Sequence, residues 1–185
     1  MSSIKEKLLE TRPSFDSLDL SKVNACNVYN PMEVRGRIAE AFVLQWLTQM
    51  QVEFINCFSN VVNHKRWIAH NHGVTVYDGG NSIREFDFVF SHDSNVYIAE
   101  VKSLKLNGIE QKIPRSLDLA QEQFQQPVHM LLFFPQYTNK VVDAKNIEDR
   151  HPQVICIDTG YKRKGLENAV SRFYASRHYA SRSML

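Results

Sequence analysis

Two carboxylates and a lysine lie where two neighbouring β-strands are predicted. Residues 84–90 alternate polar and apolar side chains, and residues 96–103 form an apolar run that ends in charged residues. Both patterns are typical of strands. The intervening Ser-His-Asp-Ser-Asn favours a turn, so the two segments are predicted to form a hairpin. Asp87 lies on the first strand, and Glu100 and Lys102 lie on the second.

The predicted turn determines which residues face each other. If residues 93–94 form a two-residue turn, Asp87 lies opposite Glu100 and Glu85 lies opposite Lys102. A slip of two residues places Asp87 opposite Lys102 and keeps all four on one face, whereas a slip of one residue reverses the faces. The permitted registers bury three aromatic side chains on the other face, Phe86, Phe88 and Phe90.

Carboxylates at this spacing indicate a cation site. Directly opposed β-carbons are ~5 Å apart, and ionised carboxylates that close repel each other unless a cation lies between them. Magnesium prefers oxygen ligands and retains several waters, and a lysine beside it can orient water and stabilise charge on a phosphate. The alternative is a surface ion pair on an exposed strand face. The apolar residues Val96 and Ile98, which precede Glu100 on its face, argue against that alternative.

A fourth acidic residue lies within a predicted helix. Residues 33–50 carry apolar side chains at every fourth position, which predicts a long, buried helix. Glu40 is the only charged residue in the stretch 38–47, and buried charges require a partner. Its partner is either Arg37, three residues earlier, or a metal ion. The metal ion is favoured because Arg35 and Arg37 lie nearer the helix start, where they could meet a phosphate.

The remaining patterns predict an α/β protein, with a mixed central β-sheet flanked by helices. The further expected elements are a strand region at 52–62, a loop at 63–82 with a short strand at 74–77, a helix at 114–126, strands at 128–134 and 154–158, and a helix at 166–179. We expect three parts: an N-terminal extension (1–32), a core domain (33–160) and a basic C-terminal helix packed on or beside the core (161–185).

The hairpin residues and the order of elements resemble a nuclease superfamily. Arg-Glu-Phe-Asp-Phe-Val-Phe at 84–90 and Val-Tyr-Ile-Ala-Glu-Val-Lys at 96–102 resemble the D…ExK core of the PD-(D/E)XK, or restriction-endonuclease-like, nucleases. Glu40, within Gly-Arg-Ile-Ala-Glu-Ala-Phe, resembles the acidic residue of that superfamily's first core helix. The resemblance implies an αβββαβ core over about residues 33–160. The proline that names the motif is absent, and so is the Gln-x-x-x-Tyr of one exonuclease branch.

The resemblance also implies residue roles. Asp87, Glu100 and the backbone carbonyl of Val101 would bind a metal ion, Glu40 would bind it directly or through water, and Lys102 would position the attacking water. The implied cofactor is Mg²⁺, for which Mn²⁺ can substitute. The expected activity is endonucleolytic hydrolysis of phosphodiester bonds in DNA. An RNA-directed nuclease remains open, as does a catalytically silent nucleic-acid-binding or scaffold module of the same fold.

Basic residues gather near the C-terminus. Residues 160–185 carry six basic side chains and one acidic side chain, in a chain whose net charge is only +2. This distribution is compatible with a phosphate-rich partner or with a solvated helix face. DNA is favoured over RNA as the partner, and a homodimer or larger protein complex remains open. The candidate nucleic-acid contacts are Arg35, Arg37, Lys65, Arg66, Lys162, Arg163, Lys164 and Arg172.

The composition is that of an ordinary globular protein, with 43% hydrophobic and 23% charged residues among 185. Its apolar runs are too short for a membrane span, so no membrane partner is expected. The first ten residues carry charges where a signal peptide would be apolar. The three cysteines form no motif or disulfide framework, which favours a reducing, cytoplasmic location.

Overall fold

The computed structural model describes residues 3–24, 30–58, 62–70, 73–103, 108–135 and 144–182, with side chains described up to Arg177. Within these residues the helices are α1 (Ile4–Thr11), α2 (Pro31–Gln49), α3 (Ile113–Phe124), α4 (Ala144–Arg150) and α5 (Arg163–Arg182), with short 3-10 turns η1 (Phe15–Ser17), η2 (Leu20–Lys22) and η3 (Glu110–Lys112). The strands are β1 (Glu53–Phe54), β2 (Lys65–His70), β3 (Gly73–Asp78), β4 (Asn81–Phe86), β5 (Phe88–His92), β6 (Asn95–Val101), β7 (Val128–Phe134) and β8 (Val154–Asp158).

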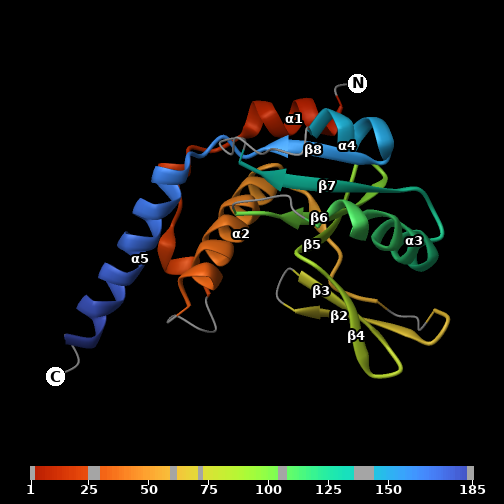
Figure 1. Cartoon of the computed structure of the whole chain (residues 1–185), viewed down its shortest axis with the longest axis horizontal. Coiled ribbons are helices and arrows are strands. Elements are labelled where there is room, and N and C mark those ends of the chain that lie inside the picture. Colours follow the sequence, from red (N-terminus) through yellow and green to blue (C-terminus); the bar gives the residue numbers. More distant parts are fainter. Residues whose placement is uncertain are drawn as a thin grey trace.

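These strands form two sheets (Figure 1). The larger is a five-stranded mixed sheet in the order β1-β5-β6-β7-β8, and the smaller is an antiparallel sheet in the order β2-β3-β4. The protein is therefore an α/β protein, as predicted, with a second sheet that the sequence did not predict. In the described part of the chain, no helix is both long and apolar enough to cross a membrane.

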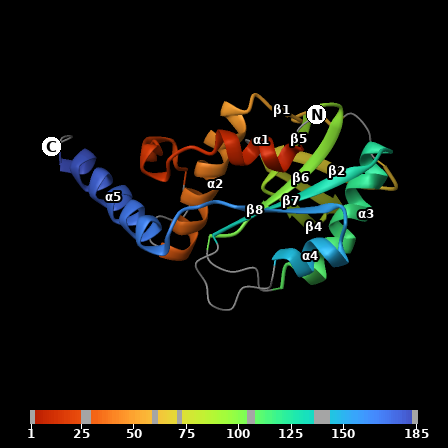
Figure 2. The same cartoon turned by 90° about the horizontal axis from the view of Figure 1, so that it is seen from above.

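Both faces of the larger sheet are buried. Successive side chains of a strand point to opposite faces, so each strand contributes to two core clusters. One core cluster joins a face of the sheet to α1, α2 and α5, and its strand residues are Phe88, Phe90, Tyr97, Ala99, Val101, Leu131, Phe133 and Ile157. The other cluster joins the opposite face to α3, α4 and the small sheet, through Val89, Val96, Ile98, Val128, Met130, Leu132, Phe134, Val154 and Cys156. Figure 2 shows α1 and α2 on one side of β7 and β8, and α4 on the other.

Helix α2 is the predicted buried helix and is confirmed. Asn30 caps it by accepting a hydrogen bond from the Met32 backbone N–H, and Pro31 occupies its first turn. The predicted boundary between extension and core, after residue 32, therefore falls inside this helix. The first helix, α1, belongs to the same core cluster, and the Trp46 indole N–H donates to the Leu8 carbonyl at 2.8 Å.

The predicted short strand at 74–77 is confirmed within β3, but the loop predicted for the rest of 63–82 is wrong, because most of it forms the small sheet. Trp67 of β2 stacks on Phe86 of β4, with ring centroids 5.4 Å apart, and buries its side chain in the second cluster. Turn-forming residues scattered through this segment suggested a loop. The three strands are instead stabilised by pairing with one another, which local composition does not reveal. The expected strand region at 52–62 shrinks to β1 and a single bridge at Val62, while residues 59–61 lie outside the described structure.

The predicted hairpin register is confirmed for β5 and β6. Phe88 pairs with Ala99 and His92 with Asn95, so Asp93 and Ser94 form the two-residue turn. Both turn residues have positive φ, 48° for Asp93 and 62° for Ser94. A two-residue turn of this kind favours glycine at its second position.

The Ser94→Gly protein is therefore expected to be more stable than the wild type by about 0.5–1 kcal/mol, because glycine adopts positive φ without steric strain. The free energy of unfolding, measured in urea, tests this expectation. Ser82 lies in β4 and has no positive φ, so Ser82→Gly is the matched control and should destabilise the protein. Stabilisation by both substitutions, or by neither, would contradict the turn geometry.

The chain changes sheets at Asp87, between the end of β4 and the start of β5. Phe86 consequently packs in the second cluster, while Phe88 and Phe90 pack in the first, so the expected common face of the three phenylalanines is wrong. The expected pairing of Glu85 with Lys102 is also wrong, because Glu85 pairs with Thr75 on β3. Polar and apolar residues alternate without interruption from β4 into β5, so no local pattern indicated the change of sheet at Asp87.

The parallel strands β6, β7 and β8 end at one edge of the large sheet. Strands β7 and β8 have the predicted bounds, and helices were predicted where α3 and α5 occur. Helix α4 was not predicted, because Ile147 is its only buried residue and leaves no apolar periodicity. Lys102 follows β6 and Thr159 follows β8, so both lie at the carboxyl ends of these parallel strands.

Candidate active site

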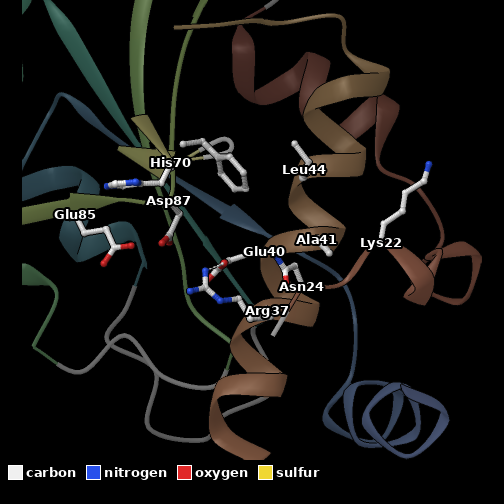
Figure 3. A pocket seen from close by; sticks show the side chains of 11 residues that line it. Lys22, Asn24, Arg37, Glu40, Ala41, Leu44, His70, Glu85 and Asp87 are labelled. Carbon is white, nitrogen blue, oxygen red and sulfur yellow. Dashed lines mark hydrogen bonds and ion pairs between the residues drawn. The ribbon is translucent and has the colours of Figure 1, made fainter. Parts of the chain in front are cut away.

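A cleft of about 600 Å³ lies between α2, the ends of β2 and β4, and the start of β5. We call it the acidic cleft and define it by Arg37, Glu40, His70, Glu85 and Asp87, which line it. Figure 3 shows Glu40 of α2 and Asp87 of the corner between sheets directed into the same space, with Glu85 beside them. The structure thus brings together two of the predicted site residues from elements distant in sequence.

Asp87 is held by the backbone of the neighbouring strand. Its Oδ2 accepts a hydrogen bond from the Val101 N–H at 2.6 Å, and its own N–H donates to the Ala99 carbonyl at 3.1 Å. Burial, followed by the charges of Glu100 and Glu40, raises the pKa of Asp87 to about 8, against the opposing effects of the Val101 N–H and Lys102. Asp87 is therefore next to two other carboxylates, as the sequence predicted.

Glu100 is the most enclosed acidic residue in the described part of the chain, with 4% of its surface exposed. Lys102 donates to its Oε2 at 2.9 Å, and Arg84 of β4 forms an ion pair with its Oε1. Arg84 was not predicted as a site residue. Its place on the apolar face of a predicted strand was a usable signal, because a buried arginine requires an acidic partner.

Replacing Arg84 with methionine should destabilise the fold by about 2 kcal/mol or more, because it removes a counter-ion from a buried carboxylate. Only 10% of the Arg84 side chain is exposed, and the guanidinium also lies over the Phe86 ring, 5.4 Å from its centroid. Arg37→Met removes a more exposed ion pair and is the matched control, expected to cost less than about 1 kcal/mol. Urea unfolding of both proteins measures the difference, and equal losses would contradict the assigned role of Arg84.

Glu40 takes part in the ion pair that was its alternative assignment. Its Oε2 accepts from Arg37 Nη1 at 2.7 Å. Burial raises the pKa of Glu40, the contacts with Arg37 act to lower it, and the charge of Glu85 raises it further. Glu40 nevertheless faces the acidic cleft, so the ion pair and a role in the cleft occur together.

The donor set limits how a metal ion could bind. Among the described residues, no group of three or more His, Cys, Asp or Glu side chains is arranged to hold an ion. Both Glu100 oxygens are engaged by basic residues. Within the same part of the chain, Asp87 Oδ1 and Glu40 Oε1 accept no hydrogen bond. Two such carboxylates, completed by water, fit Mg²⁺, which commonly binds through one or two carboxylates.

The predicted nucleic-acid contacts are dispersed. Arg37 alone of them lines the acidic cleft. Lys65 forms an ion pair with Glu122 of α3 at 2.5 Å. Lys65 and Arg66 begin β2, whereas the cleft residue His70 ends it, roughly 16 Å from Lys65 along the strand. Lys162 and Lys164 line a different cavity. Of the other three, Arg35 donates to the Met32 sulfur, Arg163 pairs with Glu167, and Arg172 is exposed on α5.

Lys22, Asn24 and His70 are polar residues of the cleft that the sequence did not assign to the site. Lys22 and Asn24 belong to the segment assigned as an extension, and His70 belongs to the segment assigned as a loop. Glu85 reaches the cleft from β4, and not through the predicted pairing with Lys102. Their positions depend on how the small sheet and the N-terminal segment meet α2, which no local pattern encodes.

Comparisons with protein-family models, with curated proteins and with solved structures find no match to this chain. The superfamily resemblance therefore rests on the motif residues of the sequence.

Proposed function

We propose that this protein is a metal-dependent nuclease that hydrolyses phosphodiester bonds of DNA, on a core resembling the PD-(D/E)XK nucleases. One observation carries the proposal: Asp87 accepts a hydrogen bond from the Val101 N–H between Glu100 and Lys102, whose side chains pair with each other, and Glu40 of α2 lines the acidic cleft together with Asp87. An endonuclease is the form that the motif favours. Mg²⁺ is the proposed cofactor, and Mn²⁺ should substitute for it.

Each residue has a distinct proposed task. Asp87, oriented by the Val101 N–H, and Glu40 would hold the ion through their free oxygens, and Glu100 and the Val101 carbonyl would support them. When bound, the ion would supply positive charge to the phosphate and acidify water. Lys102 would orient the attacking water and stabilise the charge that develops on the phosphate, since its side chain is 31% exposed and fixed by Glu100.

A second candidate is a nucleic-acid-binding module that does not cut. It is favoured by the internal counter-ions, because Arg84 and Lys102 neutralise Glu100 and Arg37 neutralises Glu40. Such a network stabilises a fold without a metal ion. The free oxygens of Asp87 and Glu40 favour the nuclease instead.

A cleavage panel separates the candidates. Duplex, single-stranded and branched DNA, together with RNA, are incubated with the wild type and with Asp87→Asn, in Mg²⁺, Mn²⁺ or chelator. Metal-dependent cutting of DNA by the wild type, lost in Asp87→Asn, supports the proposal. Binding without cutting under every condition favours the silent module, and cutting of RNA alone identifies an RNA-directed nuclease. The absence of both binding and cutting contradicts all three.

A further inference from the structure

A second cavity, of about 510 Å³, lies between the segment after α1 and the start of α5. We call it the basic pocket and define it by Arg12, Thr159, Lys162, Lys164 and Gly165, which line it. It shares no lining residue with the acidic cleft. In Figures 1 and 2, α2 lies between α5 and the small sheet, so the basic pocket is separate from the site described above.

The start of α5 presents backbone donors to the basic pocket. The Leu166 N–H donates to the Lys162 carbonyl at 3.1 Å, so the N–H groups of residues 163–165 precede the first hydrogen bond of the helix. This helix has 20 residues and no acidic residue in its first turn. The first turn instead carries Arg163 and Lys164, an unfavourable placement at the positive end of a helix dipole. A bound anion would relieve that repulsion.

Thr159 supplies a second, independent indication of a ligand. Only 1% of its surface is exposed, and its Oγ1 has no hydrogen-bond partner within the described residues. Its N–H donates to the Phe134 carbonyl at 3.0 Å, so the strand pairing of β8 extends to Thr159. Strand alternation then places the Thr159 side chain on the same face of the sheet as Ile157. Ile157 belongs to the first core cluster, which also contains Tyr161 of the pocket wall. A buried hydroxyl without a partner is unfavourable, and an anion in the pocket would accept a hydrogen bond from it.

Glycine at position 160 allows a further cation to approach. Gly160 has φ of +74°, and a Cβ there would lie 2.6 Å from Arg12 Nη1. The Arg12 guanidinium therefore lies against the backbone, where Nη1 donates to the Asp158 carbonyl at 3.4 Å. The lining has one opposing charge, that of the exposed Asp16, against three basic side chains.

We propose that the basic pocket binds a phosphate group. The N–H groups at the start of α5 and the Thr159 hydroxyl would donate to its oxygens, and Lys162, Lys164 and Arg12 would balance its charge. The phosphate could belong to a nucleic-acid backbone or to a terminal or free phosphate. Lys102 and Thr159 follow strands two places apart at one sheet edge, about 10 Å by strand spacing, so a nucleic acid is one natural source. The proposal does not depend on catalysis in the acidic cleft.

The first test measures binding of inorganic phosphate to the full chain by calorimetry, with ionic strength held constant by chloride. Thr159→Val removes one hydroxyl without changing side-chain size, and Lys164→Ala removes one charge. Each is expected to weaken phosphate binding about fivefold or more, because a hydrogen bond to a charged group is lost. Lys112→Ala is the matched control, since Lys112 is exposed in η3 and does not line the pocket, and it should bind as the wild type does.

The stability of Thr159→Val shows whether the variant folds. Without phosphate it should be at least as stable as the wild type, because it removes an unpaired buried hydroxyl. Phosphate should then raise the melting temperature of the wild type more than that of the variant. Equal phosphate affinity in the wild type, Thr159→Val and Lys164→Ala would overturn the proposal, as would a wild type that responds to phosphate no more than to chloride.

The second test identifies the source of the phosphate. It uses oligonucleotides of one sequence, with and without a 5′-phosphate. A preference for the phosphorylated strand that Thr159→Val abolishes identifies a terminal phosphate. Equal binding of both strands, weakened equally by Thr159→Val, identifies a backbone phosphate. Oligonucleotide and phosphate binding that neither substitution changes would reject the pocket, whatever the cleavage panel shows.

Discussion

Replacing Lys102 with alanine is expected to reduce the cleavage rate at saturating substrate by roughly a hundredfold or more, while metal and DNA binding remain nearly unchanged. Lys102 would act on charge that develops only in the transition state, and loss of one such group commonly has an effect of this size. Its Nζ bonds Glu100 Oε2 at 2.9 Å and contacts neither of the two free carboxylate oxygens. Single-turnover kinetics, together with calorimetric binding of Mn²⁺ and of DNA, test both halves of this expectation.

Two controls separate this effect from a loss of structure or of charge. Lys22 lines the acidic cleft and its side chain is 80% exposed, so Lys22→Ala should weaken DNA binding and its salt dependence without changing the saturated rate. Arg84 still neutralises Glu100 in Lys102→Ala, so that protein should fold. Cleavage by Lys102→Ala at the wild-type rate would show that the site assignment is wrong.

The metal-free protein should lose stability as the pH rises from about 4 to about 8. The folded protein holds the Asp87 proton up to about pH 8, whereas the unfolded chain releases it near 3.8. In that interval the folded state binds more protons than the unfolded state, so the free energy of unfolding falls with rising pH. A pKa shift of this size corresponds to a decrease on the order of 5 kcal/mol. The raised pKa of Glu40 acts in the same direction.

The other resolved shifts act mainly outside this interval. The pKa values of Asp19, Asp93 and Glu122 are lowered by hydrogen bonds from their partners, so their contributions are lost in acid. Burial raises the pKa of the Cys156 thiol to about 12, and it therefore acts only in alkali. Between pH 5 and 8 the expected slope belongs chiefly to the acidic cleft.

Urea unfolding at pH 5, 6.5 and 8 measures how the free energy of unfolding changes with pH. Each measurement is made without metal and with Mg²⁺ at ten times its dissociation constant, a concentration that adds roughly 1.4 kcal/mol of stability by mass action. The ion should help most at pH 8, where it compensates the ionised carboxylates, and so should flatten the slope. Asp87→Asn keeps an acceptor for the Val101 N–H and removes the titrating group, so its slope should be smaller without metal. An unchanged slope in Asp87→Asn would locate the effect elsewhere.

Local patterns were sufficient to predict the elements whose own sequence shows a clear apolar pattern or a capping residue. Helix α2 was predicted because apolar residues recur along its buried face, and β7 and β8 because their short apolar runs suit strands buried on both faces. The turn at Asp93 and Ser94 followed from its composition, and it fixed the pairing of β5 with β6. The meeting of Asp87, Glu100 and Lys102 follows from that pairing, which is why it was predictable.

The small sheet was not predictable in the same way. Turn-forming asparagines and glycines before and after strand β2 suggested a loop, whereas β2 is held by pairing with β3 and by the contact of Trp67 with Phe86. The change of sheet at Asp87 was equally concealed, because alternation continues through residues 84–90 while the neighbours of the chain change. Pairing partners, and not local propensity, determine these strands.

Sequence patterns were therefore enough to select the four candidate site residues, to predict the α2 helix that carries one of them and to predict the hairpin register that joins the other three. Their counter-ions became visible in the folded protein alone, since Arg84 reaches Glu100 from another sheet. The folded protein also showed that Lys162 and Lys164 line a separate basic pocket and not the acidic cleft. Periodicity encodes which face of an element a residue occupies, whereas the neighbour of that face depends on how the elements pack together.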